Sequence, residues 1–249
     1  MNPALESERV ISQREIAIDA GRAVLNGSLR LPENPIGIVL FAHGSGSSRF
    51  SPRNRFVAEM LLGRNIATSL FDLLTRDEES VDQRTAKLRF DIDLLAKRLI
   101  AATRWVMSNP DTSTLKIGFF GASTGAAAAL VAAAQLRATV AAVVSRGGRP
   151  DLAGDSLAFV RAPTLLIVGG RDEVVIEMNR QAMAKMLCAP KELVVIPGAT
   201  HLFEEPGTLE EVARMAAQWF SDHFSGAAKA HSERLQPSEW PPRGGFYGE

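Results

Sequence analysis

The chain has 249 residues, 46% of them hydrophobic and 22% charged, which is enough apolar material for one sizeable core. Its 28 basic and 28 acidic residues give a formal net charge of zero. A neutral chain has no overall field that attracts nucleic acid or an anionic membrane, so we expect neither as a partner. The first 15 residues lack the apolar core of a signal peptide, and no apolar stretch approaches the roughly 18 residues that span a bilayer. These features predict a cytoplasmic protein.

In chain order, residues 15–31 predict two short strands with a turn near Gly21. Residues 36–48, IGIVLFAHGSGSS, form an apolar run that ends in a Gly/Ser cluster. Such runs are typical of central parallel strands that are covered by helices on both faces. A helix is expected next, with Ser51 as its N-cap and Pro52 at its first position.

Strands and helices then alternate along the rest of the chain. Strands are predicted over 67–74, 115–122, 140–148, 163–170 and 192–199, and helices over 90–109, 123–138, 174–189 and 209–224, with a polar connection between 74 and 90. This alternation predicts an α/β fold with a mostly parallel sheet of about eight strands and helices on both faces. The two opening strands lack a helix between them and are expected to form an antiparallel edge. We expect residues 1–225 to form one domain and residues 226–249 to form a Pro/Gly-rich tail.

A candidate nucleophile lies in Gly121-Ala122-Ser123-Thr124-Gly125, a G-x-S-x-G sequence. The motif follows the apolar strand LKIGFF and opens an alanine-rich helix, which is the context of a nucleophile elbow. A tight turn of this kind holds the serine hydroxyl above the sheet, beside the positive end of the helix. Ser123 is therefore the predicted nucleophile.

A serine hydroxyl needs a base, and His201 is the candidate among four histidines because it follows the last predicted strand. His43 is expected to shape its loop, and His223 and His231 are expected to lie on the surface. The carboxylate that orients the base should lie between serine and histidine in the chain. We therefore predict Asp172, in the segment GGRDEVV, with Asp151 as the competing candidate.

An oxyanion hole needs two backbone N–H donors. The amide of Thr124, directly after the nucleophile, is one candidate. The second is expected from the loop His43-Gly44-Ser45-Gly46, with the Ser45 amide preferred and the Gly46 amide as the alternative. The loop lacks the lysine of a P-loop and the spacing of a dinucleotide-binding loop, so phosphate binding is disfavoured there.

With these residues placed, the chain resembles the α/β-hydrolase superfamily from about residue 15 to 225. The segments HGSGSS, GASTG, GGRD and GATH occur in the expected order. Within the superfamily it is similar to the dienelactone-hydrolase-like group, although dienelactone hydrolases proper carry cysteine where this chain has Ser123. The resemblance implies an α/β-hydrolase fold and a serine esterase. Some relatives are fused to a phosphoribosyltransferase-like domain, for which we expect no room in this chain.

The connection after residue 148 is too short for a helical cap domain, so a shallow, open site for small esters is expected. Several arginines lie near the same sheet edge in the sequence, and Arg49 and Arg146 are candidates for binding a substrate carboxylate. Salt bridges to nearby acids, such as Asp72 or Asp91, are the alternative that we favour.

The predicted function is hydrolysis of small carboxylic esters through an acyl-enzyme formed by Ser123, His201 and Asp172. The same residues could act on lactones, thioesters or phosphotriesters, and a non-catalytic binding module is the alternative from another class. We expect no metal and no organic cofactor, a small-molecule ester as the partner, and a monomer or homodimer.

Overall fold

Eight strands form one sheet in the order β1-β2-β4-β3-β5-β6-β7-β8. The computed structural model describes residues 11–188 and 190–225. The strands are β1 (Ile11–Asp19), β2 (Val24–Pro32), β3 (Gly37–Ala42), β4 (Ile66–Phe71), β5 (Ile117–Ala122), β6 (Val140–Arg146), β7 (Thr164–Gly169) and β8 (Lys191–Ile196). Strands β3 to β8 run parallel, whereas β1 and β2 pair antiparallel and β2 joins β4 antiparallel. The predicted sheet and its antiparallel edge are confirmed.

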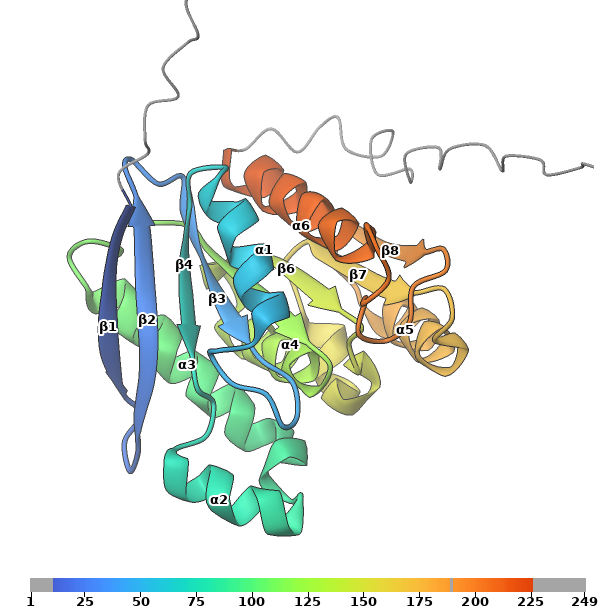
Figure 1. Cartoon of the computed structure of the whole chain (residues 1–249), viewed down its shortest axis with the longest axis horizontal. Coiled ribbons are helices and arrows are strands. Elements are labelled where there is room, and N and C mark those ends of the chain that lie inside the picture. The colour runs from blue at the N-terminus through green and yellow to red at the C-terminus, as the bar shows by residue number, and fades with distance from the viewer. Residues whose placement is uncertain (1–10, 189, 226–249) are drawn as a thin grey trace, which may run out of the picture.

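Helices cover the sheet on both faces, as Figure 1 shows. On one face lie α1 (Pro52–Leu62) and α6 (Thr208–Ser225), and on the other lie α3 (Ile92–Ser108), α4 (Thr124–Leu136) and α5 (Glu173–Lys185). Successive side chains of a strand point to opposite faces, so Phe119 of β5 packs in the α3–α4 core and Phe120 packs in the α1–α6 core. Two-sided burial explains why β3, β4, β5 and β7 are buried along their whole length.

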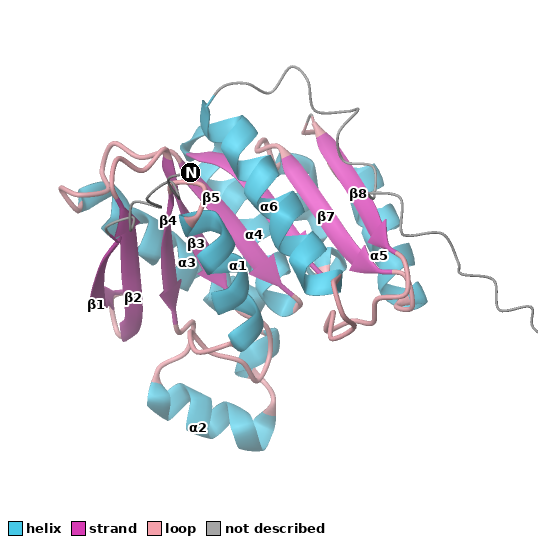
Figure 2. Ribbon diagram, turned by 45° about the horizontal axis from the view of Figure 1, so that its top comes forward, coloured by secondary structure: helices cyan, strands magenta, loops and turns pink. Residues whose placement is uncertain are grey.

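One helix was not expected. The polar connection predicted between residues 74 and 90 contains α2 (Arg76–Thr85) and the short 3-10 helix η1 (Leu88–Phe90). Thr75 accepts a hydrogen bond from the Glu78 amide, and the Glu78 side chain accepts one from the Thr75 amide, so a capping box starts the helix. Figure 2 shows that α2 projects from the body of the molecule.

The connection between β6 and β7 contains only the short 3-10 helix η3 (Pro150–Phe159), which packs against α4 and α5. No cap domain is inserted there, as predicted. Within the described ranges, no helix combines the length and apolar character needed to cross a membrane. The predicted tail, 226–249, lies outside the described residues.

Candidate active site

Ser123 occupies a sharp turn between the end of β5 and the start of α4. Its backbone has φ 51° and ψ −122°, a strained conformation for a residue with a side chain. The turn is possible because glycines flank it. A Cβ on Gly121 would lie 2.4 Å from the Cα of Ala126, and one on Gly125 would lie 2.1 Å from the Ala42 carbonyl oxygen. The local structure therefore has the form of a nucleophile elbow.

His201 and Asp172, which are 29 positions apart in the chain, meet at the same edge of the sheet. His201 lies in the turn after β8, and Asp172 is the residue before α5. The distance between His201 Nδ1 and Asp172 Oδ2 is 2.6 Å. A carboxylate accepts this hydrogen bond from Nδ1–H and so leaves Nε2 available as a base.

The imidazole of His201 also lies beside the strand end next to the elbow. A Cβ on Gly147 would lie 3.5 Å from Nδ1 and Cε1 of His201. The preceding residue, Arg146, accepts a hydrogen bond from the Ser123 amide at 3.3 Å through its carbonyl oxygen. Among the described residues, Ser123 and His201 share no hydrogen bond, but both lie against this short strand end.

The alternative carboxylate, Asp151, and the nearby histidine, His43, have other hydrogen-bond partners. Both carboxylate oxygens of Asp151 accept hydrogen bonds from the Arg149 guanidinium, at 2.9 and 2.7 Å. His43 is buried, accepts a hydrogen bond from the Leu73 amide at Nε2, and contacts the Gly44 carbonyl oxygen through Nδ1. Burial lowers the pKa of His43, so its ring is held neutral in a structural position.

The two remaining histidines lie away from this site. His223 is partly buried in α6, where its ring packs against Trp219, rather than lying on the surface as expected. His231 is outside the described residues.

The loop that follows β3 passes directly against the elbow. A Cβ on Gly44 would lie 3.0 Å from the Cβ of Ser123. The next residue, Ser45, lies with its Oγ 3.0 Å from Oγ1 of Thr124. The two residues whose amides were predicted as oxyanion donors are therefore neighbours beside Ser123.

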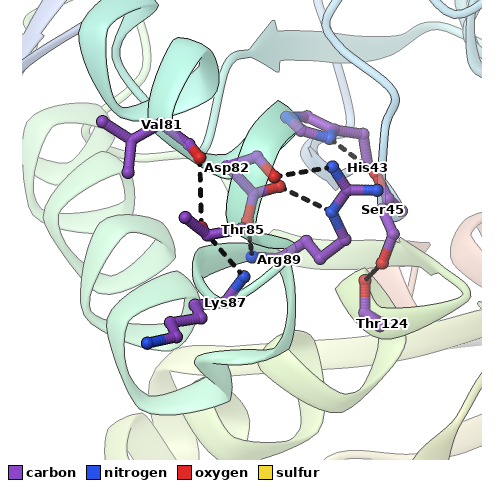
Figure 3. Close-up of polar contacts among 9 residues, drawn as sticks. His43, Ser45, Val81, Asp82, Thr85, Lys87, Arg89 and Thr124 are labelled. Carbon is purple, nitrogen blue, oxygen red and sulfur yellow. Dashed lines mark hydrogen bonds and ion pairs between the residues drawn. The ribbon is translucent and has the colours of Figure 1, made fainter.

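A buried ion pair lies next to this loop, as Figure 3 shows. Asp82 of α2 is 1% exposed, and its carboxylate accepts hydrogen bonds from the Arg89 amide and Nε at 3.0 and 2.6 Å. The Arg89 side chain lies between Asp82 and Ser45. Sequence reasoning missed this pair because it missed α2, although the Thr75-x-x-Glu78 capping box was a readable signal for that helix.

A cavity of about 990 Å³ opens beside the loop that follows β3. Its walls come from the loop between β3 and α1 and from α2, and they include Ser45, Phe50, Arg53, Asp72 and Glu79. This cavity is large enough for a small-molecule ligand.

The two arginines predicted to bind substrate differ in their surroundings. Arg49 forms an ion pair with Asp72, and its amide donates to the same carboxylate at 2.8 Å. This pairing favours the salt-bridge alternative for Arg49. Arg146, by contrast, is 7% exposed and forms no ion pair within the described part of the chain.

Across residues 11–188 and 190–225, no three His, Cys, Asp or Glu side chains gather in a group that could hold a metal ion.

Known proteins resemble this chain in sequence and in structure. The sequence model of the dienelactone hydrolase family matches residues 56–231. A crystal structure of dienelactone hydrolase from Anabaena variabilis ATCC 29413 is 58% identical and has a TM-score of 0.83, with 85% of this chain and 97% of that chain covered. Est1E from Butyrivibrio proteoclasticus has a TM-score of 0.71 at 18% identity, over 85% and 99% of the two chains, which shows a shared fold.

A Mycobacterium tuberculosis protein, provisionally named as a phosphoribosyl transferase, is 60% identical over 216 residues. The match covers 87% of this chain and 48% of that protein. The chain therefore spans about half the length of this curated relative.

Proposed function

Because this chain belongs to the dienelactone hydrolase family, we propose that it is a serine hydrolase that cleaves small carboxylic esters. The observation that carries the proposal is the 2.6 Å hydrogen bond between His201 and Asp172, beside the strained turn of Ser123. A nucleophile, a base and a carboxylate that orients the base are the groups that acyl transfer needs.

In the proposed mechanism, Ser123 Oγ attacks the ester carbonyl carbon while Nε2 of His201 takes the hydroxyl proton. The amides of Ser45 and Thr124 stabilise the negative charge that develops on the carbonyl oxygen. Removing one such donor typically costs on the order of 3 kcal/mol of barrier. The tetrahedral intermediate collapses, the alcohol leaves with the proton from His201, and an acyl-Ser123 ester remains.

Water then completes the reaction. His201 takes a proton from the water as it attacks the acyl-enzyme, and returns that proton to Ser123 Oγ when the carboxylic acid leaves. Asp172 keeps Nδ1 protonated throughout and stabilises the imidazolium that forms in each step. No atom outside the chain, the ester and water is required for these steps to balance.

Burst kinetics with p-nitrophenyl acetate and p-nitrophenyl butyrate test the proposal. The native protein should release about one equivalent of nitrophenol in a burst and then turn over. Ser123→Ala should show neither phase, while Ser113→Ala, a change at an exposed serine after α3, should behave as the native protein. Hydrolysis that survives in Ser123→Ala would assign the nucleophile elsewhere, and inactivity of the native protein would remove the esterase proposal.

A lactone is the second candidate substrate, because the 58% identical structure is that of a dienelactone hydrolase. The same groups would open a lactone ring, with the ring alcohol as a leaving group that stays attached to the acyl chain. Comparing kcat/KM for the aromatic lactone dihydrocoumarin and for phenyl propionate distinguishes the two preferences. The assay uses the native protein and Ser123→Ala for both compounds.

A further inference from the structure

Residues 44–47 form a tight turn beside the elbow, called here the 44–47 turn. The Ser47 amide donates a hydrogen bond to the Gly44 carbonyl oxygen at 3.2 Å, and Gly46 has φ 63°. A positive φ at the third position is typical of a type II turn, which favours glycine there. Glycine has more backbone freedom than other residues, so a turn with two glycines keeps one conformation only if its surroundings hold it.

The 44–47 turn lies directly against the proposed nucleophile. A Cβ on Gly44 would lie 3.0 Å from the Cβ of Ser123. Ser45, whose amide is an oxyanion donor in the proposed mechanism, has its Oγ 3.0 Å from Oγ1 of Thr124. A donor of this kind is effective only at about 2.7 to 3.1 Å from the oxyanion. The placement of the turn therefore decides how much the Ser45 amide contributes.

Arg89 packs against the same turn from the side of α2. Its side chain lies between Asp82 and Ser45, as Figure 3 shows, and its Nη1 atom lies 3.9 Å from the position of a Cβ on Gly46. The turn, Arg89, Asp82 and Thr124 all line one cavity of about 10 Å³, which holds at most one water molecule. The turn thus has little room to move while Arg89 is in place.

Asp82 fixes the direction of the Arg89 side chain. The Asp82 carboxylate accepts hydrogen bonds from Arg89 Nε at 2.6 Å and from the Arg89 amide at 3.0 Å, and the Asp82 carbonyl oxygen accepts one from Nη2 at 3.1 Å. A free arginine side chain samples many conformations, and these three bonds select one. The guanidinium nitrogen that remains, Nη1, is the one that faces Gly46.

We propose that Arg89, held by Asp82, is a positioning residue that fixes the 44–47 turn and so aims the Ser45 amide at the oxyanion. The proposal rests on the proposed hydrolase function. Because the Asp82 carboxylate neutralises the guanidinium, the pair contributes placement rather than net charge. Preorganised donors need such support from residues that do not touch the substrate themselves.

Arg89→Lys separates this role from simple neutralisation of Asp82. Lysine gives the buried carboxylate a positive charge, but its ammonium group is a point charge without the planar fork that reaches Gly46. We expect Arg89→Lys and Arg89→Met to lower kcat for p-nitrophenyl acetate about tenfold and to change KM less than about twofold, because only the transition state loses stabilisation. Arg84→Met, at an exposed position of α2, should match the native protein.

Nuclear magnetic resonance tests the placement of the turn without any catalysis. Relaxation of the ¹⁵N nuclei gives the order parameters of the Ser45, Gly46 and Ser47 amides, which should be about 0.85 in the native protein and fall below about 0.6 in both Arg89 variants. The amides of β7 should keep their values and serve as the internal control. Each variant is assayed at a temperature at which its unfolding curve shows it to be folded.

Each outcome bears on one claim. Unchanged order parameters in Arg89→Lys would overturn the proposal, and so would an unchanged kcat of this variant when the native protein hydrolyses the ester. If Arg89→Met does not fold, Arg89→Lys decides, because it keeps a counter-charge for Asp82. If the native protein hydrolyses no ester, the hydrolase function fails, while the order parameters still decide whether Arg89 holds the turn.

Discussion

Gly125 packs so closely against Ala42 that a Cβ at position 125 would lie 2.1 Å from the Ala42 carbonyl oxygen. We therefore expect Gly125→Ala to push α4 away from β3 and to destabilise the protein by about 3 kcal/mol. Because Ser123 lies two residues away, the proposed hydrolase activity should fall as well. Urea unfolding and kcat measurements check the two effects. Gly63→Ala is the matched control. Gly63 has an α-helical φ of −59°, and a Cβ there would lie 3.3 Å from the Met60 carbonyl oxygen.

Asp172→Asn should lower kcat by about 10³ to 10⁴ and leave the fold intact, because an amide no longer fixes the tautomer of His201. Asp151→Asn tests the competing carboxylate and should reduce kcat less than about threefold, since Asp151 is bound by Arg149. Steady-state kinetics on the same ester compare the two variants. A larger loss in Asp151→Asn would exchange the roles of the two residues.

The pair formed by Asp82 and Arg89 should stabilise the protein in a pH-dependent way. Burial alone would raise the pKa of the Asp82 carboxyl, but hydrogen bonds from Arg89 outweigh it and lower the pKa below its ordinary value of 3.8. A lowered carboxyl pKa contributes stability above pH 3.8 that is lost as the pH falls through the folded-state pKa.

We therefore expect Asp82→Asn to cost about 3 kcal/mol of unfolding free energy at pH 7, and the gap to the native protein to narrow below about pH 4. Urea unfolding between pH 7 and pH 3.5 measures the gap. Asp77→Asn, at an exposed position of the same helix, should cost less than about 1 kcal/mol. A gap that does not depend on pH would show that the lost charge is not the cause.

His43 should make the protein less stable as the solution becomes mildly acidic. Burial lowers the pKa of His43 from 6.5, so below pH 6.5 this imidazole binds a proton in the unfolded chain but stays neutral in the folded chain. The unfolding free energy should then decrease by up to about 1.4 kcal/mol per pH unit until the folded-state pKa is reached. Unfolding curves between pH 7.5 and pH 5 should show this slope in the native protein and a smaller one in His43→Gln. Parallel slopes would contradict the assignment.

Strands that are buried on both faces were the easiest elements to predict from the sequence. The central strands β3, β5 and β7 are buried on both faces, so each is a continuous apolar run that can be recognised without a structure. The elbow at Ser123 could be predicted because close backbone contacts require both of its glycines, Gly121 against Ala126 and Gly125 against Ala42 of β3. These requirements leave a fixed G-x-S-x-G spacing in the sequence.

Other features leave a weaker signature or none. Helix α2 is polar on nearly all sides, so no apolar stripe marks it, and the capping box of Thr75 and Glu78 is the signal for its start. The sequence does not distinguish Arg49 from Arg146. Asp72, from another segment, pairs with Arg49, whereas no carboxylate among the described residues pairs with Arg146. Periodicity predicts which face of an element is buried, but it does not predict which charges meet.

The attachment of α2 has a consequence for how proteins of this architecture can diversify. Asp82 is the one residue of that helix that the body of the protein buries, and it is held by Arg89 in the next turn of the chain. A second contact comes from Glu78, whose carboxylate pairs with Arg98 of α3 at 2.7 Å. The helix is thus held by few side chains, although it forms one wall of the cavity. Exchanging residues 76–85 for another segment that keeps these two carboxylates would alter that wall while the folding of the sheet proceeds as before.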